Sequence, residues 1–176
     1  MAVFKNDPRE WERLDWRLLQ NGAVALYHRV SVLSEDTAWL QSQGYKLFAF
    51  DCARWESGPA MHQELKRVLG FPAYYANNLA SLIDCLAELD VPERSGSVIQ
   101  LRRFDAFARR ERPLAQTLLD VLETTSRGFL LTGRRFLALA QSDDPRISFE
   151  RVGARPVNWN PREWLESNRG LRAAGS

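Results

Sequence analysis

The chain has 176 residues, a mass of 20.2 kDa, 45% hydrophobic residues and 26% charged residues. These values fit one globular domain with additions, large enough to bury a core without disulfides or a structural metal. The formal net charge of +2 and the pI near 8.7 are too mildly basic to indicate a nucleic-acid-binding protein, so charge has to be considered locally.

The first 44 residues predict a helix, a strand and a second helix. Asp7 followed by Pro8 is typical of a helix start. Residues 23–27 form a short strand candidate, and residues 34–42 predict a helix that begins at a Ser-Glu-Asp cap. A second strand is expected over residues 45–50. Because a helix of this length can join neighbouring parallel strands, we expect the two strands to pair directly.

The central part of the chain alternates predicted helices and strands, which indicates an α/β fold with a small parallel sheet covered by helices on both faces. We expect the N-terminal strand and helix to extend this sheet. The elements predicted after residue 50 are a helix from Ser57 to Gly70, a helix capped by Asn77 or Asn78, a strand over 97–101, a helix from Pro113 to Gly128, and strands over 129–132 and 135–140.

The two ends of the chain are rich in tryptophan, which argues against disordered tails. We expect residues 1–44 and 142–176 to pack on a core domain of residues 45–141, with order ending near Gly170. Asn160-Pro161 repeats the Asp7-Pro8 pattern and predicts a short helix in the C-terminal extension.

Residues 71–86 contain the most informative pattern. Pro72 favours a loop that carries Tyr74 and Tyr75 to the start of a helix. The spacing of the helix then predicts two faces. One is apolar, with Leu79, Leu82, Ile83 and Leu86, and the opposite one carries Ala80, Asp84 and Glu88.

The outer face of this helix is predicted to be acidic, because residues 71–93 contain four acids and no Lys or Arg. An exposed carboxylate beside tyrosines suits recognition of a cationic protein partner. The sequence leaves open a purely structural alternative, in which Tyr74 and Tyr75 pack under the loop, Asn78 is only a cap and Asp84 is a solvated surface acid.

Catalytic and cofactor motifs are absent from the sequence, which contains no nucleophile elbow, phosphate-binding loop, dinucleotide fingerprint or zinc-protease motif. The only histidines, His28 and His62, lie in dissimilar settings. Asp84 with a nearby tyrosine lacks the second titrating group that tunes most acid–base sites. We therefore expect no enzyme, no catalytic residue, no cofactor and no bound metal.

The cysteines and the N-terminus predict the compartment. Cys52 and Cys85 lie in apolar stretches without redox or metal-binding spacing, which predicts two buried, reduced thiols. No secretory signal pattern occurs, and no stretch approaches the roughly 18 uncharged apolar residues of a membrane span. We expect a cytoplasmic protein without membrane association.

The motif Phe71-Pro72-x-Tyr74-Tyr75-x-x-Asn78-Leu79-x-x-Leu82-x-Asp84-Cys85-Leu86 resembles the barstar family of bacterial ribonuclease inhibitors. The resemblance covers roughly residues 45–141 and includes the strand that ends in Arg102-Arg103-Phe104. It implies a three-stranded parallel sheet surrounded by helices. It also implies an inhibitory surface, made by the loop and helix of residues 71–86, that blocks the active site of a secreted ribonuclease with acids.

Carried over residue by residue, the family's surface falls on Tyr74, Tyr75, Asn78 and Asp84, with Asp84 as the central acid. Three positions depart from the family pattern, because Ala80 and Thr124 stand where acids are expected and Ile83 replaces an interface tryptophan. The candidate partner-binding residues, with the neighbouring acids included, are Tyr74, Tyr75, Asn78, Asp84, Glu88 and Glu123.

The resemblance implies an inhibitor or immunity protein that neutralises a ribonuclease or ribonuclease-like toxin. The first alternative is a regulatory or scaffold protein with the same fold and a partner that is not a nuclease. The second alternative is a nucleic-acid surface formed by the arginines of one segment, which are Arg102, Arg103, Arg109, Arg110 and Arg112.

Overall fold

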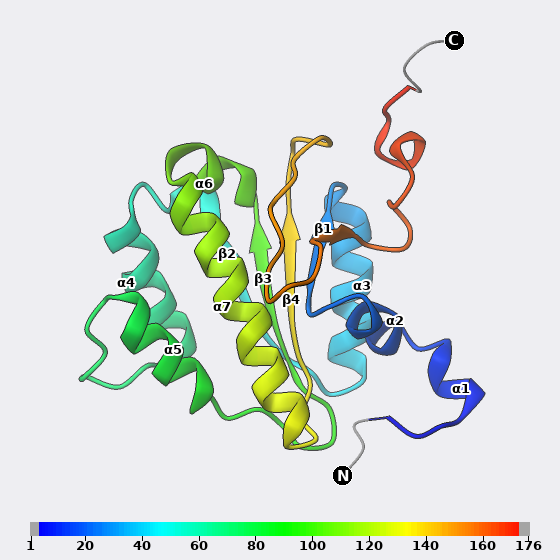
Figure 1. Cartoon of the computed structure of the whole chain (residues 1–176), viewed down its shortest axis with the longest axis horizontal. Helices are drawn as coiled ribbons and strands as arrows, with labels where there is room; N and C mark the ends of the chain where they lie inside the picture. The colour runs from blue at the N-terminus through cyan, green and yellow to red at the C-terminus, as the bar shows by residue number, and fades with distance from the viewer. Residues whose placement is uncertain (1–3, 173–176) are drawn as a thin grey trace.

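A five-stranded, fully parallel sheet forms the centre of the computed structural model, which describes residues 4–172. The strand order is β2-β3-β4-β1-β5 (Figure 1). The strands are β1 (Val24–Tyr27), β2 (Lys46–Asp51), β3 (Ser97–Arg102), β4 (Phe136–Gln141) and β5 (Asn158–Trp159). The expected parallel α/β class is confirmed.

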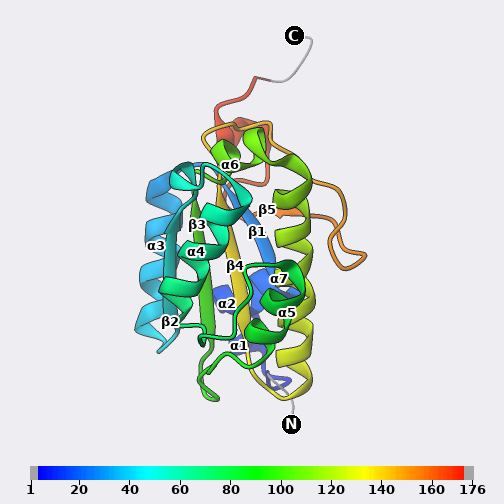
Figure 2. The same cartoon turned by 90° about the vertical axis from the view of Figure 1, so that its left-hand side faces the viewer.

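Helices cover both faces of the sheet (Figure 2). One face is covered by α2 (Leu14–Gln20) and α3 (Val30–Ser42), with the short α1 (Pro8–Trp11) beside them. The elements on the other face are η1 (Cys52–Arg54), α4 (Gly58–Leu69), α5 (Leu79–Ala87), α6 (Phe104–Arg110) and α7 (Arg112–Leu131), and the C-terminal segment adds η2 (Glu166–Arg169).

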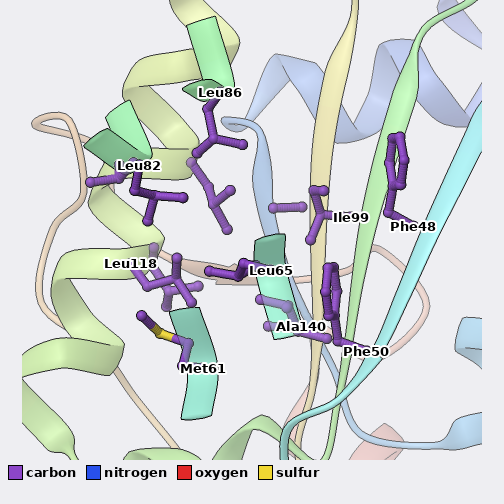
Figure 3. Packing of buried hydrophobic residues seen from close by; sticks show 14 of the residues in the cluster. Phe48, Phe50, Met61, Leu65, Leu82, Leu86, Ile99, Leu118 and Ala140 are labelled. Atoms are coloured by element: carbon purple, nitrogen blue, oxygen red, sulfur yellow. The ribbon is translucent and has the colours of Figure 1, made fainter. Parts of the chain in front are cut away.

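The larger of two hydrophobic clusters lies between the sheet and α4, α5 and α7 (Figure 3). Leu82 and Leu86 of α5 point toward Leu118 of α7, Met61 and Leu65 of α4, and the strands. Every one of these five side chains is at most 2% exposed, so burial of α5 on this core holds the helix in place. Cys52 and Cys85 are free thiols and are buried, as expected.

The predicted direct pairing of the first two strands is wrong. β1 pairs with β4, with Val24 opposite Ala138, and β5 lies on its other side. β3 and β4 occupy the positions between β1 and β2. All four residues of β1 are buried, as suits an interior strand, whereas β2 exposes Lys46 at the sheet edge.

Two helix boundaries also differ from the predictions. α3 begins at Val30 instead of near Ser34, and Asp36 is buried inside the helix. α7 continues through Gly128 to Leu131, so the predicted strand over 129–132 is helical. Phe129 stacks on Phe136 at 5.7 Å between ring centroids, and this packing favours continuation of the helix past the glycine.

The Asn160-Pro161 segment forms a turn and not the predicted helix. The Asn160 side chain accepts a hydrogen bond from the backbone N–H of Arg162 at 3.1 Å. The Glu163 carboxylate accepts hydrogen bonds from the backbone N–H groups of His28 and Arg29, at 2.9 and 3.0 Å. Arg29 is the residue before α3 and has no side-chain cap of its own, so the C-terminal segment supplies acceptors where that helix begins.

Candidate protein-binding site

A short, internally hydrogen-bonded loop joins α4 to α5. Gly70 ends α4 in the left-handed conformation with a φ of 67°, which glycine adopts at little cost. The N–H of Tyr75 donates to the carbonyl of Pro72 at 3.0 Å, and Asn78 caps α5 by accepting from the N–H of Ser81 at 2.9 Å. Asn78 therefore positions the helix start, although it is also exposed.

Tyr75 lies beneath this loop and not on its surface. Its side chain is 4% exposed and packs on Phe71 at 4.9 Å between ring centroids. Its hydroxyl is hydrogen-bonded to Nδ1 of His62. Burial raises the pKa of Tyr75 to about 12. The expectation that Tyr75 contacts a partner needs correction, because its ring is buried and its hydroxyl is hydrogen-bonded, so it supports the loop from below.

Tyr74 projects from the same loop and is 64% exposed. Its hydroxyl donates a hydrogen bond to a carboxylate oxygen of Glu88 at 2.8 Å, and this bond raises the pKa of Tyr74. Tyr74 precedes α5 and Glu88 directly follows it, so this hydrogen bond spans the exposed side of the helix. Tyr74 and Glu88 thus form part of one surface, as the sequence predicts.

The exposed side of α5 carries Ala80, Asp84 and Glu88, while Leu82, Cys85 and Leu86 face the core. Within residues 4–172 the Asp84 carboxylate forms no hydrogen bond or ion pair, so it is free to accept bonds from a partner. One member of the predicted apolar face is misplaced, because Ile83 is 48% exposed.

Glu123 lies away from this surface. It is 3% exposed, and its Oε2 atom accepts hydrogen bonds from the N–H groups of Ala23 and Val24 at 2.7 and 3.3 Å. The expected contribution of Glu123 to partner contacts is therefore corrected, because its carboxylate already satisfies backbone donors at the start of β1. The neighbouring Thr124 is exposed.

A groove of about 610 Å³ lies between α5 and α7, and Ile83, the residue before Asp84, lines it. We call it the α5–α7 groove. Its apolar and small lining residues include Ile83, Ala87, Val121, Thr125, Gly128 and Phe129. The predicted helix end at Gly128 gave no indication of this groove, although a glycine between helical residues is itself a signal for a missing side chain on a helix face.

The arginine-rich segment makes mostly intramolecular contacts. Nε of Arg103 donates to Asp51 at 2.9 Å, and Arg109 pairs with Asp105 at 2.7 Å. Arg110 donates to the carbonyl of Ala53 at 2.9 Å, and Arg112 donates to the carbonyl of Ser148. These contacts occupy four of the five arginines that a nucleic-acid surface would need.

The titrating groups near the loop suit recognition better than proton transfer. His62 is 6% exposed, and loss of solvation lowers its pKa, which favours the neutral ring. No cluster of three or more His, Cys, Asp or Glu side chains within residues 4–172 could hold a metal ion. No helix in the same range is long and apolar enough to cross a membrane.

A comparison with protein-family models gives a match. The family model described as Barstar (barnase inhibitor) matches residues 45–141, which include β2, β3, β4 and the whole loop and helix described above. No curated protein matches the chain.

Proposed function

The chain belongs to the barstar family, and on that premise we propose that it binds and neutralises a ribonuclease or ribonuclease-like toxin. The proposed contact surface consists of Tyr74, Asn78, Asp84 and Glu88. Tyr75 is assigned a supporting role beneath the loop, and Glu123 is left out because both are buried. We call this set of four residues the α5 face.

The observation that carries the proposal is the exposure of Asp84 and its lack of an internal partner in the part of the chain that the structure describes. An exposed acid without an internal partner stands in the middle of the α5 face, and residues 71–93 contain no Lys or Arg to neutralise it. A ribonuclease active site holds cations that bind RNA phosphates. A carboxylate presented on a rigid helix matches such cations through charge-assisted hydrogen bonds.

Inhibition of barnase tests the proposal directly. We expect the purified chain to suppress cleavage of an RNA substrate at stoichiometric concentrations. Asp84→Ala should weaken the complex by at least about 2 kcal/mol, or roughly 30-fold, a size typical of interface hot spots in general, the barnase and barstar pair among them. Glu12→Ala, which removes an exposed acid outside the matched region, is the control and should leave inhibition unchanged.

Salt provides an independent check on the same complex. The acidic face should speed the encounter with a cationic partner, and salt screens such fields over about 10 Å at 0.1 M. We expect added salt to slow association more than it speeds dissociation in stopped-flow or surface-binding measurements. Equal inhibition by the wild-type chain and Asp84→Ala would contradict the proposal.

A second candidate is a regulatory or scaffold protein whose partner is not a nuclease. Ala80 and Thr124 are exposed at positions where the family resemblance implies acids, so the surface is less negative than expected. This candidate predicts that barnase is not inhibited, while Asp84→Ala still abolishes binding of the protein's own partner.

A further inference from the structure

The α5–α7 groove adjoins the α5 face and is not explained by it. Both views place α5 and α7 side by side (Figures 1 and 2). Phe129 and Val121, which are 6% and 7% exposed, contribute to the apolar lining. The volume of about 610 Å³ lies within the range of roughly 300–1,000 Å³ for small-ligand pockets, so one large side chain fits.

The groove is open because α7 lacks a side chain at Gly128. A Cβ atom added there would meet no atom within 4 Å. Gly128 is not among the glycines with positive φ, so neither backbone conformation nor close packing requires glycine. A glycine in a helix interior destabilises the helix relative to alanine. The chain therefore keeps the groove open although filling it would stabilise the fold.

The charges around the groove define the chemistry of its occupant. Ile83 and Ala87 line it, and each is followed directly in the sequence by an acid, Asp84 within α5 and Glu88 just after its end. Asp120 lines the groove on the α7 side, and one of its carboxylate oxygens accepts a hydrogen bond from the N–H of Gly153 at 2.7 Å. The rim cation Arg134 is paired with Glu93 at 3.6 Å. An apolar group inside the groove thus has acids beside it, which favour a neighbouring positive charge.

We propose that the protein bound at the α5 face inserts a large apolar side chain into the α5–α7 groove, next to a basic residue that meets Asp84. This inference rests on the proposed function, because it needs a partner at that face. It adds a specificity element, since a cationic protein without such a side chain would satisfy the acids and leave the groove empty. Burial of an apolar anchor in a pocket contributes strongly to protein interfaces.

Filling the groove tests the proposal. Gly128→Leu places a side chain in the open space on α7, and Ala38→Leu adds the same group at an exposed position of α3 on the other face of the sheet. We expect Gly128→Leu to weaken barnase binding at least tenfold while its melting temperature is unchanged or higher. Ala38→Leu should bind like the wild-type chain.

The outcomes separate the two proposals. If Asp84→Ala weakens binding but Gly128→Leu does not, or if Gly128→Leu binds more tightly, the groove proposal is overturned and the α5 face stands. If neither variant changes the binding of barnase, both proposals fail. A drop in melting temperature for Gly128→Leu would also contradict the open groove.

A small probe tests the groove without a protein partner. Phenethylammonium combines an aromatic ring with a positive charge, as the groove and its rim require. In a titration followed by backbone amide NMR, we expect saturable millimolar shifts at Ile83, Ala87 and Thr125. The shifts should be lost in Gly128→Leu and weakened in Asp84→Ala. No saturable shifts at these residues, or equal shifts in Gly128→Leu, would overturn the proposal.

Discussion

The acids of the α5 face and the buried acids of the two terminal extensions have opposite surroundings. Asp84 and Glu88 are exposed, and Asp84 has no partner among residues 4–172. Asp15, Asp36 and Glu163 are at most 7% exposed. Each of these three accepts hydrogen bonds from several donors.

The buried acids connect segments that are distant in sequence. Asp15 accepts from the hydroxyl of Tyr45 at 2.7 Å and from Arg13 at 3.1 Å. Burial opposes its ionisation, but the bonds from Arg13 and Tyr45 outweigh this cost, and the pKa of Asp15 is lowered. Asp36 accepts from Tyr27 and Arg162. Burial dominates there and raises the pKa of Asp36.

The contrast shows that an acidic residue stabilises the fold or serves recognition according to its burial and its donors. A buried acid whose donors lose their acceptor leaves unsatisfied polar groups and is costly to remove. An exposed acid without internal donors costs the fold little when replaced, and its negative charge remains available to a partner. The following substitutions test this contrast, in order of decreasing expected effect on folding.

Glu163→Ala should have the largest effect. It leaves the N–H groups of His28 and Arg29 and the side-chain amide of Asn160 without their carboxylate acceptor in a buried region. We expect a loss of at least about 3 kcal/mol in the free energy of unfolding, measured by urea denaturation. Glu166→Ala, an exposed acid three residues later, should change it by less than about 0.5 kcal/mol.

Glu123→Ala should rank second. It removes the acceptor for the N–H groups of Ala23 and Val24, and we expect a loss of about 2 kcal/mol in unfolding free energy. Glu123→Gln keeps a side-chain oxygen and should lose less. Both variants should inhibit barnase like the wild-type chain once folded. Weaker inhibition by the folded Gln variant would show that this acid also serves the partner.

His62 should make the free energy of unfolding depend on pH, with a smaller effect than the loss of Glu163 or Glu123. Loss of solvation lowers its pKa in the folded chain, so below pH 6.5 the unfolded chain binds more protons. Stability is therefore retained above pH 6.5 and falls as the pH drops through the folded pKa. His62→Gln should flatten this part of the curve of melting temperature against pH. An unchanged slope would assign the dependence to other groups.

Tyr74→Phe should have the smallest effect on folding. It removes one hydrogen bond to Glu88 at the surface, and we expect a change below about 0.5 kcal/mol in unfolding free energy. The same variant should weaken partner binding measurably, because the hydroxyl is the polar end of an exposed contact residue. A large loss of stability would mean that Tyr74 belongs with the buried supports.

Local sequence signals were sufficient to predict where the helices around the α5 face begin and end. Ser57, Gly70 and Asn78 cap or end helices at the predicted places, because caps act on backbone groups within a few residues. Such local signals could not predict which of Tyr74 and Tyr75 is buried. Two adjacent loop tyrosines have similar local surroundings, and only packing on Phe71 and His62 buries Tyr75 and leaves Tyr74 exposed.

The extensions were harder to predict, because distant residues decide their structure. The start of α3 depends on Glu163, which lies 135 residues from His28. The position of β1 depends on β4 and β5, and nothing in residues 23–27 identifies those neighbours. The end of α7 depends on the contact of Phe129 with Phe136. Propensity within a window cannot include such contacts.

The placement of β1 between β4 and β5 bears on how the chain is made. Ribosomes release the N-terminal strand first, yet Leu26 accepts the hydrogen bonds of Asn160, 134 residues away. During synthesis both edges of β1 therefore stay unpaired until β4 has emerged, and the second edge stays unpaired until β5 has emerged. Contacts of such separation slow folding. We expect a nascent chain stopped after β4 to hold β1 on one side only and to depend on its last 35 residues for completion of the sheet.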